Sequence, residues 1–102
     1  MDKSVRISML LEIYRKMLTE KQADVVDLYY NQNLSLGEIA EDLNITRQAV
    51  RKSLVEAEKN LFMFEEKLEI LEKQIKREQK IDKIIKNIED EKLKKFIEEL
   101  RM

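Results

Sequence analysis

The sequence predicts an all-α protein. Its 102 residues include no proline and one glycine, Gly37, so the residues that tight strand-connecting turns require are nearly absent. Leu, Ile, Glu, Lys and Gln, which are good or tolerated helix formers, dominate the chain. Apolar residues recur at spacings of three and four, the period of an amphipathic helix. A chain of this length predicts one compact domain plus an extension.

Composition excludes several classes of function. Charged residues make up 40% of the chain but leave a net charge of −1, so any basic surface must be local. Cysteine and histidine are both absent, which removes disulfides, Cys/His zinc sites and the commonest general base. We therefore expect no metal, no cofactor and no enzymatic activity. No segment approaches the apolar run of about 18 residues that a membrane span needs, and no secretory signal is visible at the N-terminus, which predicts a cytoplasmic protein without membrane insertion.

Four helix starts follow from apolar spacing and capping residues. The first segment carries an apolar stripe formed by Val5, Met9, Leu10, Ile13, Met17 and Leu18. Thr19 with Gln22, and Ser35 with Glu38, have the spacing of capping boxes that open the second and third helices. The second helix should end at residues 31–33, where two Asn residues tolerate left-handed backbone angles. Thr46 is expected to cap a fourth helix.

Residues 34–54, LSLGEIAEDLNITRQAVRKSL, meet the geometric demands of a helix-turn-helix. Ala40 supplies a small side chain where the two helices cross, and Asn44 suits the left-handed position of the turn. Val50 supplies the branched side chain that points back at the first helix. The remaining core positions are expected to be Ile39, Leu43 and Ile45. Because several requirements are met at fixed offsets, this signal is stronger than any single residue type.

The run LTEKQADVVDLYYNQNLSLGEIAEDLNITRQAVRKSLVEAEKNL resembles the region 4 helix-turn-helix of bacterial sigma factors. Together with the EEKLEILEKQ helix, the segments LTEKQ, LYY, SLGEIAEDLNITRQAV and AEKNL resemble the YlxM family of helix-turn-helix proteins, over residues 1 to about 77. The resemblance implies a DNA-binding type of helix-turn-helix without a wing, followed by a long C-terminal helical extension. It also implies a link to the signal recognition particle, because the gene of this family lies beside the genes of the particle's GTPase and its receptor. Arg51, followed by Lys52, departs from the aromatic residue that such proteins often carry after QAV.

In a helix-turn-helix, the helix that begins at Thr46 lies in the DNA major groove. Arg47, Gln48 and Arg51 are of types that bind base edges. Phosphate contacts suit Lys52 and the hydroxyls of Ser35 and Thr46. The alternative is that each of these is an ordinary solvated residue at the start of a surface helix. Residues 46–60 hold four cations against two carboxylates, a surplus that predicts weak binding by a monomer and favours a homodimer.

A heptad run predicts the surface that would pair two copies. Apolar residues continue from Val50 to Ile75 at alternating intervals of four and three, typical of a coiled-coil seam on one unbroken helix from residue 46 to about 75. The expected seam residues are Leu54, Leu61, Phe64, Leu68, Leu71 and Ile75. The alternative is that the seam packs within the same chain. We expect a head over residues 1–60 and an extension over 61–102 that is coiled-coil-like to about 75 and continues as two short helices.

The C-terminal segment begins with a fully polar stretch, 76–80, that predicts a hinge or helix end. Asp90 is placed to cap the last helix, and its expected buried stripe comprises Leu93, Phe96, Ile97 and Leu100. Residues 76–86 form a second local basic segment, which is either a solvated helix face or a contact for RNA, lipid or protein.

Two functional hypotheses remain. The first is a regulatory protein that binds nucleic acid, DNA rather than RNA, through the helix starting at Thr46. The second, implied by the family resemblance, is an accessory factor of the signal recognition particle that binds its components without reading DNA. A-form RNA excludes a helix from its narrow major groove, so an RNA partner would be bound through phosphates, loops or shape.

Overall fold

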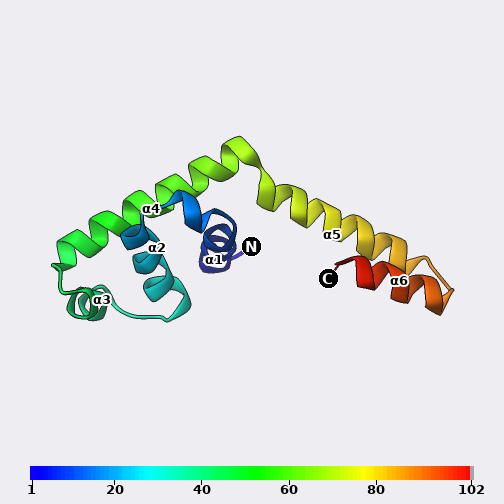
Figure 1. The fold of residues 1–102 in the computed structure, drawn as a ribbon, viewed down its shortest axis with the longest axis horizontal. Coiled ribbons are helices and arrows are strands. Elements are labelled where there is room, and N and C mark those ends of the chain that lie inside the picture. Colours follow the sequence, from blue (N-terminus) through cyan, green and yellow to red (C-terminus); the bar gives the residue numbers. More distant parts are fainter. Residues whose placement is uncertain (102) are drawn as a thin grey trace. The chain divides into compact units, whose positions relative to one another are not determined.

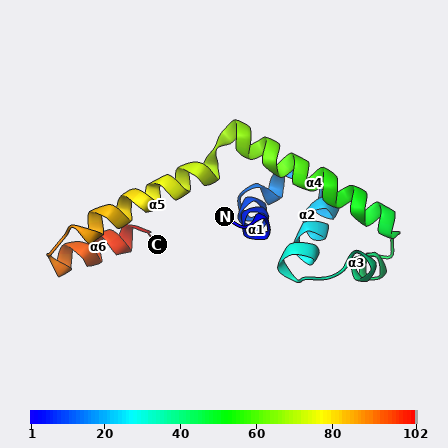
Figure 2. The ribbon, with the colours of Figure 1, turned by 180° about the vertical axis from the view of Figure 1, so that it is seen from behind.

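The computed structural model describes residues 1–101 and consists of helices, with no strand among those residues. Figures 1 and 2 show their course from opposite sides. The elements are α1 (Lys3–Tyr14), a 3₁₀ turn (Arg15–Met17), α2 (Glu20–Val26), a π turn (Asp27–Asn31), α3 (Leu36–Leu43), α4 (Arg47–Leu68), α5 (Ile70–Lys86) and α6 (Glu91–Arg101). The expected all-α class is confirmed.

The chain divides into two compact units, Met1–Leu71 and Glu72–Met102. The division therefore falls later than the boundary at 60/61 expected from sequence, because α4 packs on the head beyond residue 60: Leu61 is fully buried and Leu71 is 4% exposed. Residue 102, the end of the expected extension, lies outside the described residues.

The first unit is built on α4, against which α1, α2 and α3 all pack (Figure 1). The α4 face toward these helices repeats every three or four residues, as a single buried stripe requires. It comprises Val50, Ser53, Leu54, Ala57, Leu61 and Glu65. The opposing core side chains include Ile7, Leu10, Tyr14, Val25, Val26 and Ile39.

The stripe expected on the first helix is confirmed only in part: Leu10 and Leu18 are buried, at 0% and 8% exposure, but its other members are not. The buried residues of α1 are Ile7, Leu10, Leu11 and Tyr14. Val5, Met9 and Met17 are 45%, 37% and 51% exposed. Both stripes have helical spacing, and packing against α4 selects the one that includes Tyr14.

The capping predictions are confirmed. Thr19 and Gln22 form a complete capping box at the start of α2. The second helix ends in a π turn that stops at Asn31, followed by Asn33 with φ 56°.

The continuous helix expected from residue 46 to about 75 is wrong. Helix α4 ends at Leu68, and Glu69 takes left-handed backbone angles, φ 54° and ψ 29°. The new start at α5 is stabilised by buried side chains of the head: the Glu65 carboxylate accepts from the Leu71 N–H at 3.0 Å, and the Tyr14 hydroxyl accepts from the Ile70 N–H at 3.3 Å. The heptad pattern does not reveal the break at Glu69, because the groups that bind the free N–H groups of α5 are Tyr14 of α1 and Glu65, one turn earlier in α4.

The burial of the head also decides what the residues of the heptad seam contact. Leu54, Leu61 and Leu71 are buried within the head, so they are not available to a second copy. Phe64 is half-buried beside Tyr14, with ring centroids 5.9 Å apart, and Leu68 is 44% exposed. Most of the seam therefore packs within the chain, the alternative left open by the sequence.

The second unit is a hairpin of α5 and α6, which run side by side in both views (Figures 1 and 2). The hinge expected at 76–80 is absent, because α5 is helical without interruption through this polar stretch. Asp90 caps α6 as expected, accepting from the N–H of Lys92 at 2.9 Å. The stripe expected to be buried is not: Leu93, Phe96 and Leu100 are 47%, 58% and 61% exposed.

Candidate nucleic-acid interface

Helices α3 and α4 form the helix-turn-helix, and its turn has the geometry that the sequence predicts. Asn44 has φ 55° and ψ 48°, and its N–H caps the end of α3 by donating to the carbonyls of Ala40 and Glu41. The left-handed conformation at Asn44 turns the chain from α3 into α4 within three residues. Ala40 is 7% exposed and Val50 is fully buried where the two helices meet.

All six sequence-derived contact residues are exposed and belong to the helix-turn-helix. They are Ser35, Thr46, Arg47, Gln48, Arg51 and Lys52. The ion pairs among the described residues involve none of Arg47, Arg51 and Lys52. These cations are therefore available to an external anion.

The two hydroxyls each make one helix cap and keep one donor. Ser35 Oγ accepts from the Glu38 N–H at 3.1 Å, and Thr46 Oγ1 accepts from the Ala49 N–H at 3.0 Å. A hydroxyl that accepts one bond still carries its own hydrogen. Both side chains can therefore donate to a phosphate oxygen without giving up their caps.

Helix α4 begins without an acidic residue in its first turn, where Arg47 stands instead. The neighbouring helices α2 and α3 carry Glu20 and Glu38 at the same place. Because the N-terminus of a helix has partial positive charge, a cation there costs a few tenths of a kcal/mol, up to about 1. An anion bound at the start of α4 would offset this local repulsion.

The guanidinium of Arg47 lies against the first turn of α3. A Cβ on Gly37 would stand 2.7 Å from Arg47 Nη2, so the only glycine of the chain leaves the space that this side chain occupies. The sequence shows a glycine inside a helix but gives no sign that the Arg47 side chain lies against it.

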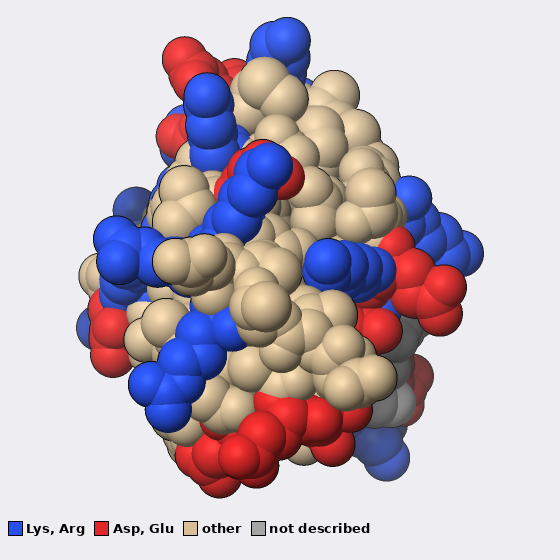
Figure 3. Space-filling model, turned by 90° about the vertical axis from the view of Figure 1, so that its left-hand side faces the viewer, with Lys and Arg blue, Asp and Glu red and all other residues tan. Residues whose placement is uncertain are grey.

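Figure 3 views the end of the molecule that carries α3 and the start of α4. Lysine and arginine side chains project separately from a largely uncharged surface, and acidic side chains gather along the lower edge of the view. This arrangement is a set of discrete cations rather than a continuous basic field. It suits a small number of phosphate contacts.

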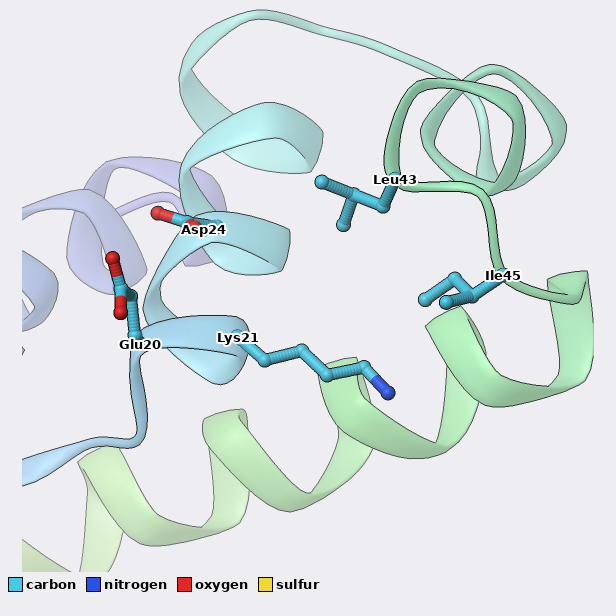
Figure 4. Close-up of a pocket in the computed structure, with 5 residues that line it drawn as sticks. All are labelled: Glu20, Lys21, Asp24, Leu43 and Ile45. Carbon is cyan, nitrogen blue, oxygen red and sulfur yellow. The ribbon is translucent and has the colours of Figure 1, made fainter.

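Sequence reasoning missed Lys21. It lies in the first turn of α2 and lines an open hollow of about 460 Å³ with Leu43 and Ile45, the residues flanking the turn (Figure 4). Its ammonium end points toward the start of α4 in this view. A second hollow, of about 430 Å³, is lined by both Lys21 and Lys52. Because α2 and α4 are far apart in sequence, only folding brings this cation beside the contact residues.

The described residues contain no group of three or more carboxylates placed to hold a metal ion. None of the helices that the structure describes is long and apolar enough to cross a membrane.

A model of the family described as "Putative helix-turn-helix protein, YlxM / p13 like", UPF0122, matches residues 1–101. The chain belongs to the UPF0122 family. It is 44% identical to a UPF0122 protein of Clostridium kluyveri over 92 residues, which cover 90% of this chain and 73% of the relative. It is 37% identical over 105 aligned residues to the UPF0122 protein lin1916 of Listeria innocua, covering 98% of this chain and 96% of the relative. A UPF0122 protein of Lactococcus lactis is 40% identical over 85 residues, 83% of this chain and 77% of the relative. The helix-turn-helix that the sequence predicts is therefore shared with the UPF0122 family.

Proposed function

We propose that this UPF0122 protein is a cytoplasmic regulatory protein that binds duplex DNA, with the start of α4 in the major groove. The observation that carries the proposal is the acid-free, exposed start of α4, which presents Arg47, Gln48 and Arg51 beside a correctly formed turn. In this docking, Arg51 and Gln48 contact base edges, while Lys52, Ser35 and Thr46 contact phosphates. Lys21 adds a further phosphate contact in this docking, because it lines the same hollow as Lys52.

The proposal includes pairing of two copies. One head offers few cations, and each phosphate contact contributes modestly and is weakened by salt. Two helix-turn-helix units on one duplex bind two half-sites about one helical turn apart. A homodimer therefore supplies affinity that a single α4 lacks.

The experiment measures fluorescence anisotropy of labelled duplex DNA of random sequence while the protein is titrated at several salt concentrations. The test variant is Arg47→Ala/Arg51→Ala. The control, Lys16→Ala/Lys67→Ala, removes the same charge from exposed positions elsewhere in the first unit. We expect the test variant to lose about tenfold or more in affinity and the control to lose clearly less, because only the test variant removes cations from the start of α4. Equal losses in the two variants would refute binding through α4.

A second titration uses signal recognition particle RNA, because the resemblance to YlxM implies that partner. Tight binding to this RNA with none to duplex DNA would overturn the DNA proposal and favour the accessory-factor alternative. Binding to neither would direct the search to the protein components of the particle.

A further inference from the structure

One side of α5 carries a line of cations, which we call the basic face of α5. Its members are exposed and follow one another at intervals of three or four: Lys73, Lys76, Arg77, Lys80 and Lys83. Residues at these spacings are neighbours on one side of a helix. From the first to the last of them the helix rises by about 15 Å. A compact array of positive charges therefore stands on a chain whose net charge is −1.

Two carboxylates of α5 lie on the opposite side of the helix. Glu78 and Asp82 are each two residues from Lys80, and residues two positions apart on a helix do not face each other. Both carboxylates form ion pairs with Arg101 of α6. The packing of α6 on α5 thus uses these negative charges on the side away from the basic face.

Most of the basic face has no partner within the chain. Lys76 pairs with Glu72 at 3.2 Å. The other four cations take part in none of the ion pairs among the described residues. They are therefore available to an external anion.

A face of this composition is unfavourable for a helix that only meets water. Like charges three or four positions apart destabilise a helix, and Arg77 has such a neighbour in both Lys73 and Lys80. The helix dipole accounts for Lys83 and Lys86 in the last turn. It does not account for Lys73, which lies near the N-terminal end, where the dipole disfavours a cation. An anion bound along the face would relieve both repulsions.

The length and chemistry of the basic face favour the phosphate backbone of a duplex. Each strand of duplex DNA carries one phosphate per about 3.4 Å of the helix axis, so about four phosphates lie within about 15 Å. Helix α5 has no aromatic residue on which an unpaired base could stack. A helix that lies on a lipid surface needs a broad apolar flank. Apart from Ile84, however, the isoleucines of α5 in the second unit are half-buried.

We propose that the basic face of α5 binds the phosphate backbone of the duplex whose major groove receives α4. This inference rests on the proposed function for the choice of DNA as the polyanion. Both units belong to one chain, so binding of α4 holds the basic face at a high effective concentration near the same duplex. The second unit thereby adds affinity that does not depend on base sequence to a head that has few cations of its own.

The test uses the full chain and the labelled random duplex of the anisotropy assay. The test variant, Lys73→Gln/Lys80→Gln, removes two unpaired cations of the basic face. The control, Lys92→Gln/Lys95→Gln, removes two exposed cations of α6 that also take part in no ion pair among the described residues. We expect the log–log salt slope of the test variant to fall by about 1.8, about 0.9 for each phosphate contact, and its affinity to fall about tenfold or more, with clearly smaller changes in the control.

Equal changes in these two variants would overturn the inference, because loss of charge alone would then explain them. The Arg47→Ala/Arg51→Ala variant separates this inference from the proposed function. If that variant loses affinity while Lys73→Gln/Lys80→Gln binds as the wild type does, the proposed function stands and the role of α5 is refuted. If only the α5 variant loses affinity, the proposed function fails and the basic face remains as the DNA-binding surface.

Cosedimentation with vesicles of phosphatidylserine and phosphatidylcholine tests a lipid surface as the partner. Vesicle binding that is lost in the test variant, with DNA affinity unchanged, would overturn the inference in favour of a membrane. Folding is checked by circular dichroism. Glutamine is a good helix former at an exposed position, so the far-UV signal should be kept, and the near-UV signal reports on the head because all three tyrosines lie in the first unit.

Discussion

Replacing Glu65 tests the account of why α4 ends where it does. Glu65 is 6% exposed, and its Oε1 accepts from the Tyr14 hydroxyl at 2.7 Å and from the Leu71 N–H at 3.0 Å. Tyr14 is 1% exposed, so its hydroxyl has little access to water. One carboxylate therefore satisfies a buried phenol and a free N–H at the start of α5.

The change Glu65→Leu removes that acceptor without opening a large cavity. Each buried donor left without a partner costs about 1–3 kcal/mol, and two donors are affected. Part of this loss is recovered if the backbone at Glu69 leaves its left-handed conformation, which costs about 1–2 kcal/mol for a residue with a Cβ. We expect a net loss of about 2–3 kcal/mol in the free energy of unfolding of the head. Glu65→Gln keeps an acceptor oxygen and should lose only about 1 kcal/mol.

The assay is urea unfolding followed by the near-UV signal of the tyrosines, which reports on the first unit. Tyr14→Phe completes a double-mutant cycle with Glu65→Gln and with Glu65→Leu, and the coupling of Tyr14 to the charged acceptor should reach about 1.5–3 kcal/mol. The reasoning fails if Glu65→Leu loses less than about 0.5 kcal/mol, the range of ordinary surface substitutions. It also fails if the Gln and Leu variants are equally destabilised.

Three further predictions concern the turn, the site and alkaline pH. Asn44→Ala should destabilise the head by about 1 kcal/mol, because alanine disfavours the left-handed conformation, while Asn44→Gly should be nearly neutral in the same urea titration. Gly37→Ala should raise the free energy of unfolding by about 0.5–1 kcal/mol through helix propensity. The same change should lower DNA affinity in the anisotropy assay, because its Cβ displaces the Arg47 guanidinium. Unchanged affinity would show that the position of this guanidinium against α3 does not matter for binding. Burial, and then hydrogen bonds to Glu65 and Glu58, raise the pKa values of Tyr14 and Tyr30 above the ordinary 10.0. The folded state therefore holds the two phenolic protons more tightly than the unfolded state does. Their contribution to the free energy of unfolding is complete below pH 10.0 and is lost as the pH rises through the raised pKa values of the folded state. A Tyr14→Phe/Tyr30→Phe variant should lack this decline when the free energy of unfolding is measured against pH.

Local features of the fold could be predicted because local chemistry decides them. Thr19, Ser35 and Thr46 satisfy N–H groups within three residues of themselves, so their spacing in the sequence is enough. Asn44 is likewise fixed by its own backbone preference. The six contact residues are all exposed on the helix-turn-helix as the spacing requires, and their role in binding stays a prediction.

Features that depend on distant partners could not be predicted. The position of the buried stripe on α1 follows from its packing on α4, and Lys21 reaches the start of α4 only when α2 is in place. The polar stretch 76–80 indicated a hinge, yet α5 runs through it, because solvent-exposed residues of good helix propensity need no buried contact to stay helical.

By itself, the sequence determined the helical class, the positions of the helix caps and the helix-turn-helix, since each depends on interactions between residues a few positions apart. The tertiary structure alone decided where α4 ends and which apolar residues the chain leaves uncovered. The reason is that a heptad pattern records which residues are apolar, but not which surface covers them. At Glu69 the deciding groups are Tyr14 and Glu65, one of which comes from a helix more than fifty residues earlier in the chain.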